Sequence, residues 1–140
     1  MHIESPESDY CFAVRQAARY ISQLYERHLC EAGITPTQFS ILCALKCSSS
    51  LTMMELAQAM VMDRTTLVRI LRPLLRNGFV ANEQDGQVRQ RLQLVLTSGG
   101  HLKLHEATTH WTAAQDEFER KFGYRRSASL RRELLRVTRA

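Results

Sequence analysis

The segment from residue 63 to residue 78 carries side chains that could recognise a polyanion. Thr65, Arg69, Arg72 and Arg76 follow one another at intervals of four, three and four residues. At about 100° per residue, this spacing places all four on one side of a helix. The opposite side is apolar and carries Leu67, Ile70, Leu71 and Leu74. One face is therefore predicted to pack and the other to present guanidinium groups; a basic face that contacts only water is the alternative.

Capping signals place two more helices before this one. Thr35-Pro36-Thr37-Gln38 and Thr52-Met53-Met54-Glu55 each put a threonine cap three residues before a Gln or a Glu. The first motif predicts a helix that continues through Lys46 and breaks at residues 48–50. The second motif predicts a short helix that continues through Met60. A tight connection then leads to Asp63, whose carboxylate is suited to cap the basic helix. Two short helices joined by a tight turn form the helix-turn-helix pattern.

Pro73 is an irregularity within the predicted basic helix. A proline there removes the hydrogen bond to the Arg69 carbonyl and costs roughly 3 kcal/mol in an unsupported helix. We expect a slight bend at this position, offset by the packing of the neighbouring leucines. Gly78 is predicted to end the helix.

Asp85-Gly86 separates two strand-like runs, residues 79–84 and 87–96, and this pattern predicts a β-hairpin. Side chains alternate along the second run: one face carries Leu92, Leu94 and Leu96, and the other carries Arg89, Arg91 and Gln93. Two arginines near the hairpin tip are therefore expected to point away from the core. A helix-turn-helix followed by an arginine-bearing hairpin is a winged helix-turn-helix, and the order of the elements is more specific than any one of them.

Long segments at both ends predict further helices. Residues 10–30 contain neither Gly nor Pro and carry apolar side chains at helical spacing, and Gly33 follows them as a cap. Thr97-Ser98-Gly99-Gly100 is predicted to form a cap and turn before a helix over 101–122. Ser127 is predicted to cap a last helix, with Leu130, Leu134 and Val137 on its inner face. The apolar faces of these terminal helices are larger than one small core can cover. We therefore expect the helices at both ends of the chain to form a dimerisation region.

Composition narrows the class of protein. The chain has 140 residues, enough for one core, and a net charge of +5 with a pI near 9.3, which favours a polyanionic partner. No apolar run has the length of a membrane span and no signal peptide is evident, so we expect a cytoplasmic protein with four reduced cysteines. A phosphate-binding glycine loop, a Gly-x-Ser-x-Gly elbow and a metal-ligand set are all missing from the sequence. We expect no enzyme, no cofactor and no metal.

The chain resembles the multiple-antibiotic-resistance regulator (MarR) family over nearly its whole length. The resemblance rests on residues 62–67, 72–80 and 96–100, and on residues 11–15 through 24–25. It implies a mainly helical α+β fold of six helices with a small β-hairpin wing. In this layout residues 1–140 form one domain, 34–97 the winged part, and 8–33 with 98–140 the dimerisation helices. It also implies a homodimer that binds pseudopalindromic promoter DNA, commonly as a repressor released by a small aromatic or phenolic molecule or by thiol oxidation.

Helix-turn-helix docking assigns the predicted DNA contacts. Arg64, Thr65, Thr66 and Arg69 are expected at or near base edges, and Arg72 and Arg76 at phosphates. Helix starts near Thr37 and Thr52 offer N–H groups to phosphates. Arg89 and Arg91 are both candidates for the minor groove. The family usually has an Asp before its wing arginine, whereas this chain has Val88, so the orientation of that arginine is in doubt.

Other side chains carry weaker hypotheses. Cys11 matches the reactive cysteine of the family's hydroperoxide sensors, and Tyr25 matches one activating tyrosine, but Pro36 stands where the other would fall. A buried apolar cysteine is the alternative. An effector is predicted to meet the following side chains, each of which is more often structural: Arg15, Arg19, His28, Tyr25 and Trp111. Cys43 with Cys47 and His101 with His105 are each four residues apart, too few ligands for a zinc site. A winged-helix scaffold that does not bind DNA is the alternative function.

Overall fold

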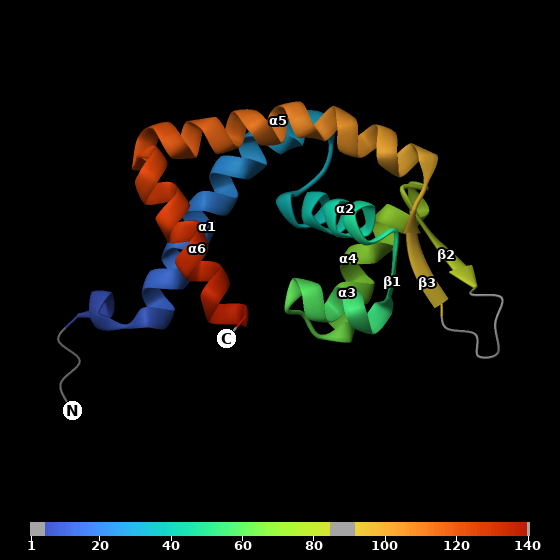
Figure 1. Ribbon diagram of the computed structural model, residues 1–140, viewed down its shortest axis with the longest axis horizontal. Coiled ribbons are helices and arrows are strands. Elements are labelled where there is room, and N and C mark those ends of the chain that lie inside the picture. The colour runs from blue at the N-terminus through green and yellow to red at the C-terminus, as the bar shows by residue number, and fades with distance from the viewer. Residues whose placement is uncertain (1–4, 85–91, 140) are drawn as a thin grey trace. The chain divides into compact units, whose positions relative to one another are not determined.

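The computed structural model describes residues 5–84 and 92–139, and its contacts divide the chain into two compact units (Figure 1). The winged unit, residues 32–109, holds α2 (Pro36–Ser48), β1 (Ser50–Thr52), α3 (Met53–Met60), α4 (Arg64–Arg76), β2 (Val80–Gln84), β3 (Leu92–Leu96) and the start of α5 (Ser98–Phe122). The helical unit, residues 1–31 and 110–140, holds η1 (Pro6–Ser8), α1 (Tyr10–Leu29), the rest of α5 and α6 (Tyr124–Arg139), and η2 (Cys30–Ala32) joins α1 to the winged unit. Six α-helices and a small antiparallel sheet within the described residues confirm the predicted fold class.

Both predicted capping boxes are present. The Gln38 amide donates to Thr35 Oγ1 at 3.1 Å, and the Thr35 amide donates to Gln38 Oε1 at 3.0 Å. The same reciprocal pair joins Thr52 and Glu55 at 3.1 and 2.9 Å. Each box satisfies two amides that a helix start would otherwise leave without a partner. The starts of α2 and α3 are therefore determined by four consecutive residues each.

The core of the winged unit forms around the apolar face of α4. Leu67, Leu71 and Leu74 are at most 1% exposed, and Ile70 is half-buried. Other helices and strands supply further buried side chains of this unit, among them Leu42, Leu45, Leu56, Val80, Leu94 and Leu104. Burying one leucine stabilises the fold by about 1.5–3 kcal/mol, so this row outweighs the loss of one backbone hydrogen bond at Pro73. Helix α4 continues through Pro73 to Arg76.

The wing is the hairpin-like pair β2 and β3, and a third strand joins it. Antiparallel pairing runs from Val80 opposite Leu96 to Gln84 opposite Leu92. Strand β1 pairs with the other edge of β3, giving the order β1-β3-β2, and the sequence did not predict it. A strand of three residues is too short to show alternation. Leu94 is buried as expected, but Leu92 at the outer end of β3 is 53% exposed, contrary to its predicted place on the core face.

A compact junction links the end of α4 to the start of α5. Gly78 adopts a φ of +76°, and the Phe79 amide donates to the Leu74 carbonyl at 2.9 Å, which ends α4 in the expected glycine-capped way. The Thr97 hydroxyl donates to the Gly78 carbonyl and accepts from the Gly100 amide at 3.0 Å. Helix α5 therefore begins at Ser98, three residues earlier than predicted, because Thr97 caps it directly. A methyl group on Gly100 would overlap the Phe79 carbonyl oxygen.

The helical unit corrects the prediction for the last helix. Helix α6 begins at Tyr124, after Gly123, so Ser127 lies inside it and does not cap it. Leu130 is half-buried, whereas Leu134 and Val137 are 43% and 76% exposed and do not lie inside this unit. The buried side chains of α1 gather toward its second half, at Leu24 and Leu29. Cys11, Val14 and Ala18, which belong to the apolar spacing of residues 10–30, are exposed within one chain, so Cys11 is not a buried apolar cysteine there.

No helix within residues 5–84 and 92–139 is both long enough and apolar enough to cross a membrane.

Replacing Gly100 with alanine is expected to destabilise the protein by about 1–3 kcal/mol, because the added methyl group has to displace the Phe79 carbonyl or the Leu96 side chain. The matched control is Gly99→Ala, whose methyl group would lie 3.4 Å from the nearest atom. Urea unfolding of both variants measures the difference in the free energy of unfolding. Equal stability of the two variants would contradict the close approach at Gly100.

Candidate nucleic-acid interface

The outer face of α4 presents a row of exposed polar side chains. Thr65, Arg69, Arg72 and Arg76 are exposed, on the side opposite the buried leucines. Arg64 is also exposed, but it is the first residue of α4 and borders the groove beside α3. The two-faced helix predicted from the spacing is therefore present. Guanidinium groups held on a packed helix can donate to base edges or to phosphate oxygens without moving the backbone.

Thr66 is placed differently from its neighbours. It is half-buried, and its amide donates to Asp63 Oδ1 at 2.7 Å. These hydrogen bonds, first from the Thr66 backbone and then from its side chain, hold the pKa of Asp63 below its ordinary value, and the nearby Arg69 acts in the same direction. Asp63 thus caps α4 as predicted. Its negative charge also interacts favourably with the positive end of the helix dipole.

The turn before α4 is as tight as the sequence suggested. Val61 adopts a φ of +53°, a conformation that a β-branched residue rarely takes, and the Met62 amide donates to the Ala57 carbonyl at 2.9 Å. Only two further residues, Met62 and Asp63, separate this turn from α4. The arrangement of α3, turn and α4 is therefore a helix-turn-helix.

The backbone N–H groups at the starts of α2 and α3 were predicted to contact phosphates, but some of them are already used within the protein. At α3 the Glu55 amide is used by Thr52, and at α2 Pro36 has no N–H while the Gln38 amide is used by Thr35. Thr37 and Thr52 are both half-buried. A groove of about 420 Å³ lies beside the start of α3, between Thr52, Met54, Arg64 and the strand residues Asn82 and Leu92.

The tip of the wing lies outside the described residues. This holds for Asp85-Gly86, for Val88, and for both minor-groove candidates, Arg89 and Arg91. Their assignments stay predictions from the sequence.

The candidates for effector binding and redox chemistry lie in the helical unit, at separate places. Cys11 and Arg15 are exposed near the start of α1, and Trp111 is half-buried on α5. Tyr25 donates its hydroxyl hydrogen to Gln115 Oε1. Since α1 is one continuous helix, Cys11 and Tyr25 are about 21 Å apart along its axis, so Tyr25 does not activate Cys11 within one chain.

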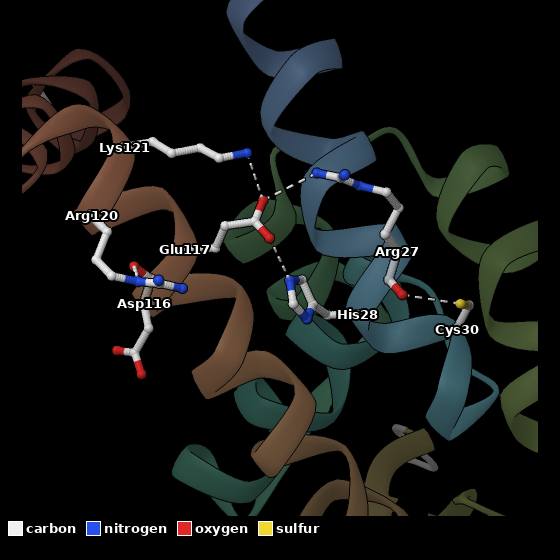
Figure 2. A network of polar contacts seen from close by, with 7 residues as sticks. All are labelled: Arg27, His28, Cys30, Asp116, Glu117, Arg120 and Lys121. Carbon is white, nitrogen blue, oxygen red and sulfur yellow. Dashed lines mark hydrogen bonds and ion pairs between the residues drawn. The ribbon is translucent and has the colours of Figure 1, made fainter.

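Figure 2 shows an ionic cluster around Glu117 that the sequence did not predict. The Glu117 carboxylate accepts from Lys121 at 3.1 Å and from Arg27 at 3.2 Å, and its other oxygen lies 3.2 Å from His28 Nε2. Hydrogen bonds from Lys121 and then from His28 lower the pKa of Glu117. His28 therefore already has a carboxylate partner in α5. Arg27 and Glu117 lie 90 residues apart in the chain, and only the Lys121 pair, at four residues, leaves a signal in the sequence.

The structure adds no third metal ligand, among the residues it describes, to the pair Cys43 and Cys47 or to the pair His101 and His105. His101 and His105 are exposed, and burial together with the neighbouring Cys47 raises the pKa of the Cys43 thiol. Among the side chains of residues 5–84 and 92–139, no three His, Cys, Asp or Glu groups lie close enough to hold a metal ion.

The positive charge is unevenly distributed. Helix α6 holds six arginines and one glutamate, so it carries a net charge of +5, the same as the whole chain. The six arginines are exposed: Arg125, Arg126, Arg131, Arg132, Arg136 and Arg139. Helix α4 adds four exposed arginines and no acidic residue, so the basic balance that suggested a polyanionic partner comes from both helices.

The fold and the exposed face of α4 together define a winged helix-turn-helix protein. A model of the MarR family matches residues 34–87. The structure of the transcriptional regulator MosR of M. tuberculosis is similar over 96% of both chains, with 31% identity and a TM-score of 0.82. MosR has also been solved with DNA, and that structure is similar over 94% of both chains, with 32% identity and a TM-score of 0.80.

More distant relatives agree with this assignment. The multiple antibiotic resistance protein MarR of Escherichia coli is 30% identical over 78 residues, which are 56% of this chain and 54% of that protein. NadR in complex with 4-hydroxyphenylacetate shares the fold over 99% of this chain and 98% of that chain, with 23% identity and a TM-score of 0.78. The chain belongs to the MarR family. It is a DNA-binding transcriptional regulator and not an enzyme, as the sequence predicted.

The low pKa of Asp63 gives its cap a defined pH dependence. A carboxyl group with a lowered folded-state pKa stabilises the fold above its unfolded value, 3.8, and loses this effect as the pH falls through the folded value. Wild type is expected to melt at a higher temperature than Asp63→Asn near neutral pH, and the difference should shrink in acid. Melting curves across this range measure it, and Glu26→Gln corrects for the loss of one exposed carboxylate. A difference that stays constant with pH contradicts the capping role of the charge.

Proposed function

We propose that the protein binds pseudopalindromic promoter DNA as a homodimer, with α4 of each protomer in the major groove. The observation that carries this proposal is the two-faced α4, in which buried leucines fix the helix and exposed arginines face outward. A recognition helix needs this rigidity, because base contacts depend on accurately placed donors.

The residues of α4 divide by their place along the helix. Arg64, Thr65 and Arg69 lie in its first two turns and are proposed to contact base edges, with Thr66 restricted by its bonds to Asp63. Arg72 and Arg76 are proposed to contact phosphates, which position the protein without reading the sequence. Arg89 or Arg91 is proposed to enter the minor groove from the wing. Free amides at the starts of α2 and α3, near Thr37 and Thr52, are proposed as further phosphate contacts.

The homodimer is proposed to form through the terminal helices. Apolar side chains of α1 and α6 remain exposed within one chain, including Val14 at 54%, Tyr20 at 59% and Leu134 at 43%. Exposed apolar surface of this extent on long helices is typical of an interface between subunits. A two-fold dimer also matches a pseudopalindromic site, because each protomer reads one half.

A small molecule is proposed to regulate DNA binding by this protein. The bound 4-hydroxyphenylacetate of NadR supports an aromatic or phenolic effector for this chain as well. We propose that the effector releases the protein from DNA, and that the protein is a repressor acting in the cytoplasm. The terminal helices carry the candidate contacts Arg15, Tyr25 and Trp111.

Arg69→Ala is expected to weaken binding to the promoter duplex upstream of the chain's own gene by about 1–3 kcal/mol and to relax its sequence preference, because a base contact is lost. Fluorescence anisotropy with specific and scrambled duplexes measures both effects. Arg120→Ala, which removes an exposed arginine from α5, is the control and should bind like wild type. Equal affinities of wild type and Arg69→Ala would remove Arg69 from the base contacts.

Arg76→Gln is expected to weaken binding to all duplexes alike, because a phosphate contact carries no sequence information. The slope of log K against log salt concentration should become shallower by about one. Titrations at several salt concentrations measure this slope for wild type and variant. No wild-type binding at any salt concentration would favour the scaffold that does not bind DNA.

A further inference from the structure

Two free cysteines lie close together near the end of α2, outside the terminal helices that are proposed to form the dimer. Cys43 and Cys47 are four residues apart, so the helix places them about 6 Å apart along its axis and within about 40° of the same direction. Cys43 is half-buried and Cys47 is exposed. The two thiols therefore share one face of α2 and remain accessible from solvent on one side.

The other two cysteines do not form such a pair. Cys11 lies near the start of α1 and Cys30 follows its last residue, so they are about 28 Å apart along the helix axis. Cys30 Sγ also donates to the Arg27 carbonyl at 3.2 Å. Within residues 5–84 and 92–139, no third His, Cys, Asp or Glu side chain joins Cys43 and Cys47. The pair thus offers two sulfur ligands and no third ligand of these types in the described part of the chain.

Two thiols on one helix face select a particular kind of ligand. A structural zinc ion takes four ligands, twice what this pair supplies. A linear two-coordinate ion holds its sulfur atoms on opposite sides, whereas these two side chains leave the helix in similar directions. A trivalent arsenic atom with one organic group, R–As(OH)₂, has three pyramidal bonds, of which two can go to sulfur on the same side. It is also a soft centre, for which thiol sulfur is the matching ligand.

We propose that Cys43 and Cys47 together bind a monosubstituted trivalent arsenical, R–As(OH)₂. Two As–O bonds break and two As–S bonds form, and each thiol proton leaves with one hydroxide as water. Arsenic stays trivalent throughout, so the step needs neither an oxidant nor a reductant.

The surroundings of the pair suit this uncharged product. Burial, and after it the nearby Cys47, raise the pKa of Cys43, which disfavours a thiolate there, and the arsenic adduct carries no charge. Once one As–S bond has formed, the helix holds the second thiol beside the arsenic atom. The second bond then forms within one molecule, which strengthens binding well beyond that of a single thiol.

The test uses the full chain without DNA, so its result is independent of the proposed function. Methylarsonous acid takes two thiols, dimethylarsinous acid takes one and arsenous acid takes three. Competition with 2,3-dimercaptopropanol measures each affinity, and methylarsonous acid is expected to bind at least about 100-fold more tightly than the other two. Trypsin cleaves after Lys46, between the two cysteines, so one CH₃As group is expected to hold the two neighbouring tryptic fragments together in mass spectra.

Cys47→Ser removes the exposed thiol and is expected to lower the affinity for methylarsonous acid at least about 100-fold, while binding of dimethylarsinous acid changes little. Cys11→Ser combined with Cys30→Ser is the control and should bind like wild type. Cys47→Ser combined with Ser48→Cys keeps the number of thiols but moves one about 140° away around the helix. This variant should bind as weakly as Cys47→Ser alone.

Several results would overturn the proposal. Equal affinity of wild type and Cys47→Ser for methylarsonous acid would show that one thiol suffices. Loss of binding in the Cys11→Ser, Cys30→Ser variant would place the site elsewhere. Wild-type affinity in the variant with the cysteine moved to position 48 would show that the shared helix face plays no part. An arsenic bridge between two chains, seen as twice the mass, would also contradict a site within one helix.

Discussion

The burial of one row of leucines fixes the orientation of α4 and of the face proposed to contact DNA. Leu67, Leu71 and Leu74 are almost fully buried in the winged core, so α4 cannot rotate without exposing them. The arginines on its other side are therefore exposed as a consequence of this packing. Asp63 fixes where this helix begins and Gly78 fixes where it ends. The orientation of the proposed nucleic-acid face thus follows from the packing of the core.

Contacts at the end of α4 also fix the positions of the first residues of the wing and of α5. The Thr97 side chain donates to the Gly78 carbonyl at the end of α4 and accepts from the Gly100 amide at the start of α5. The Thr97 amide also donates to the Phe79 carbonyl at 3.1 Å, next to the first residue of β2. Since Gly100 lies against that same carbonyl, the junction has no room for a larger residue. The end of α4, the start of β2 and the start of α5 are therefore held together by contacts among Gly78, Phe79, Thr97 and Gly100.

Sequence reasoning succeeded where the physical cause is local. The boxes at Thr35 and Thr52 join residues three apart, and the stripe of α4 repeats within two turns, so both are visible in the sequence. Strand β1 was missed because its pairing with β3 joins segments some forty residues apart. The Glu117 cluster was missed for the same reason, and the start of α5 because glycines at 99 and 100 look like a turn. The burial of Ser127 follows from tertiary packing alone.

Two helices, α4 and α6, carry the positive charge of the chain, with net charges of +4 and +5. The rest of the chain has a net charge of −4, because the whole chain carries +5, so the positive long-range electrostatic field arises from both helices. Such a field governs how often a protein encounters a polyanion, and it is screened within about 10 Å at 0.1 M salt. Substitutions of the α6 arginines are therefore expected to change the rate of encounter with DNA while leaving intact the α4 arginines that are proposed to read the sequence.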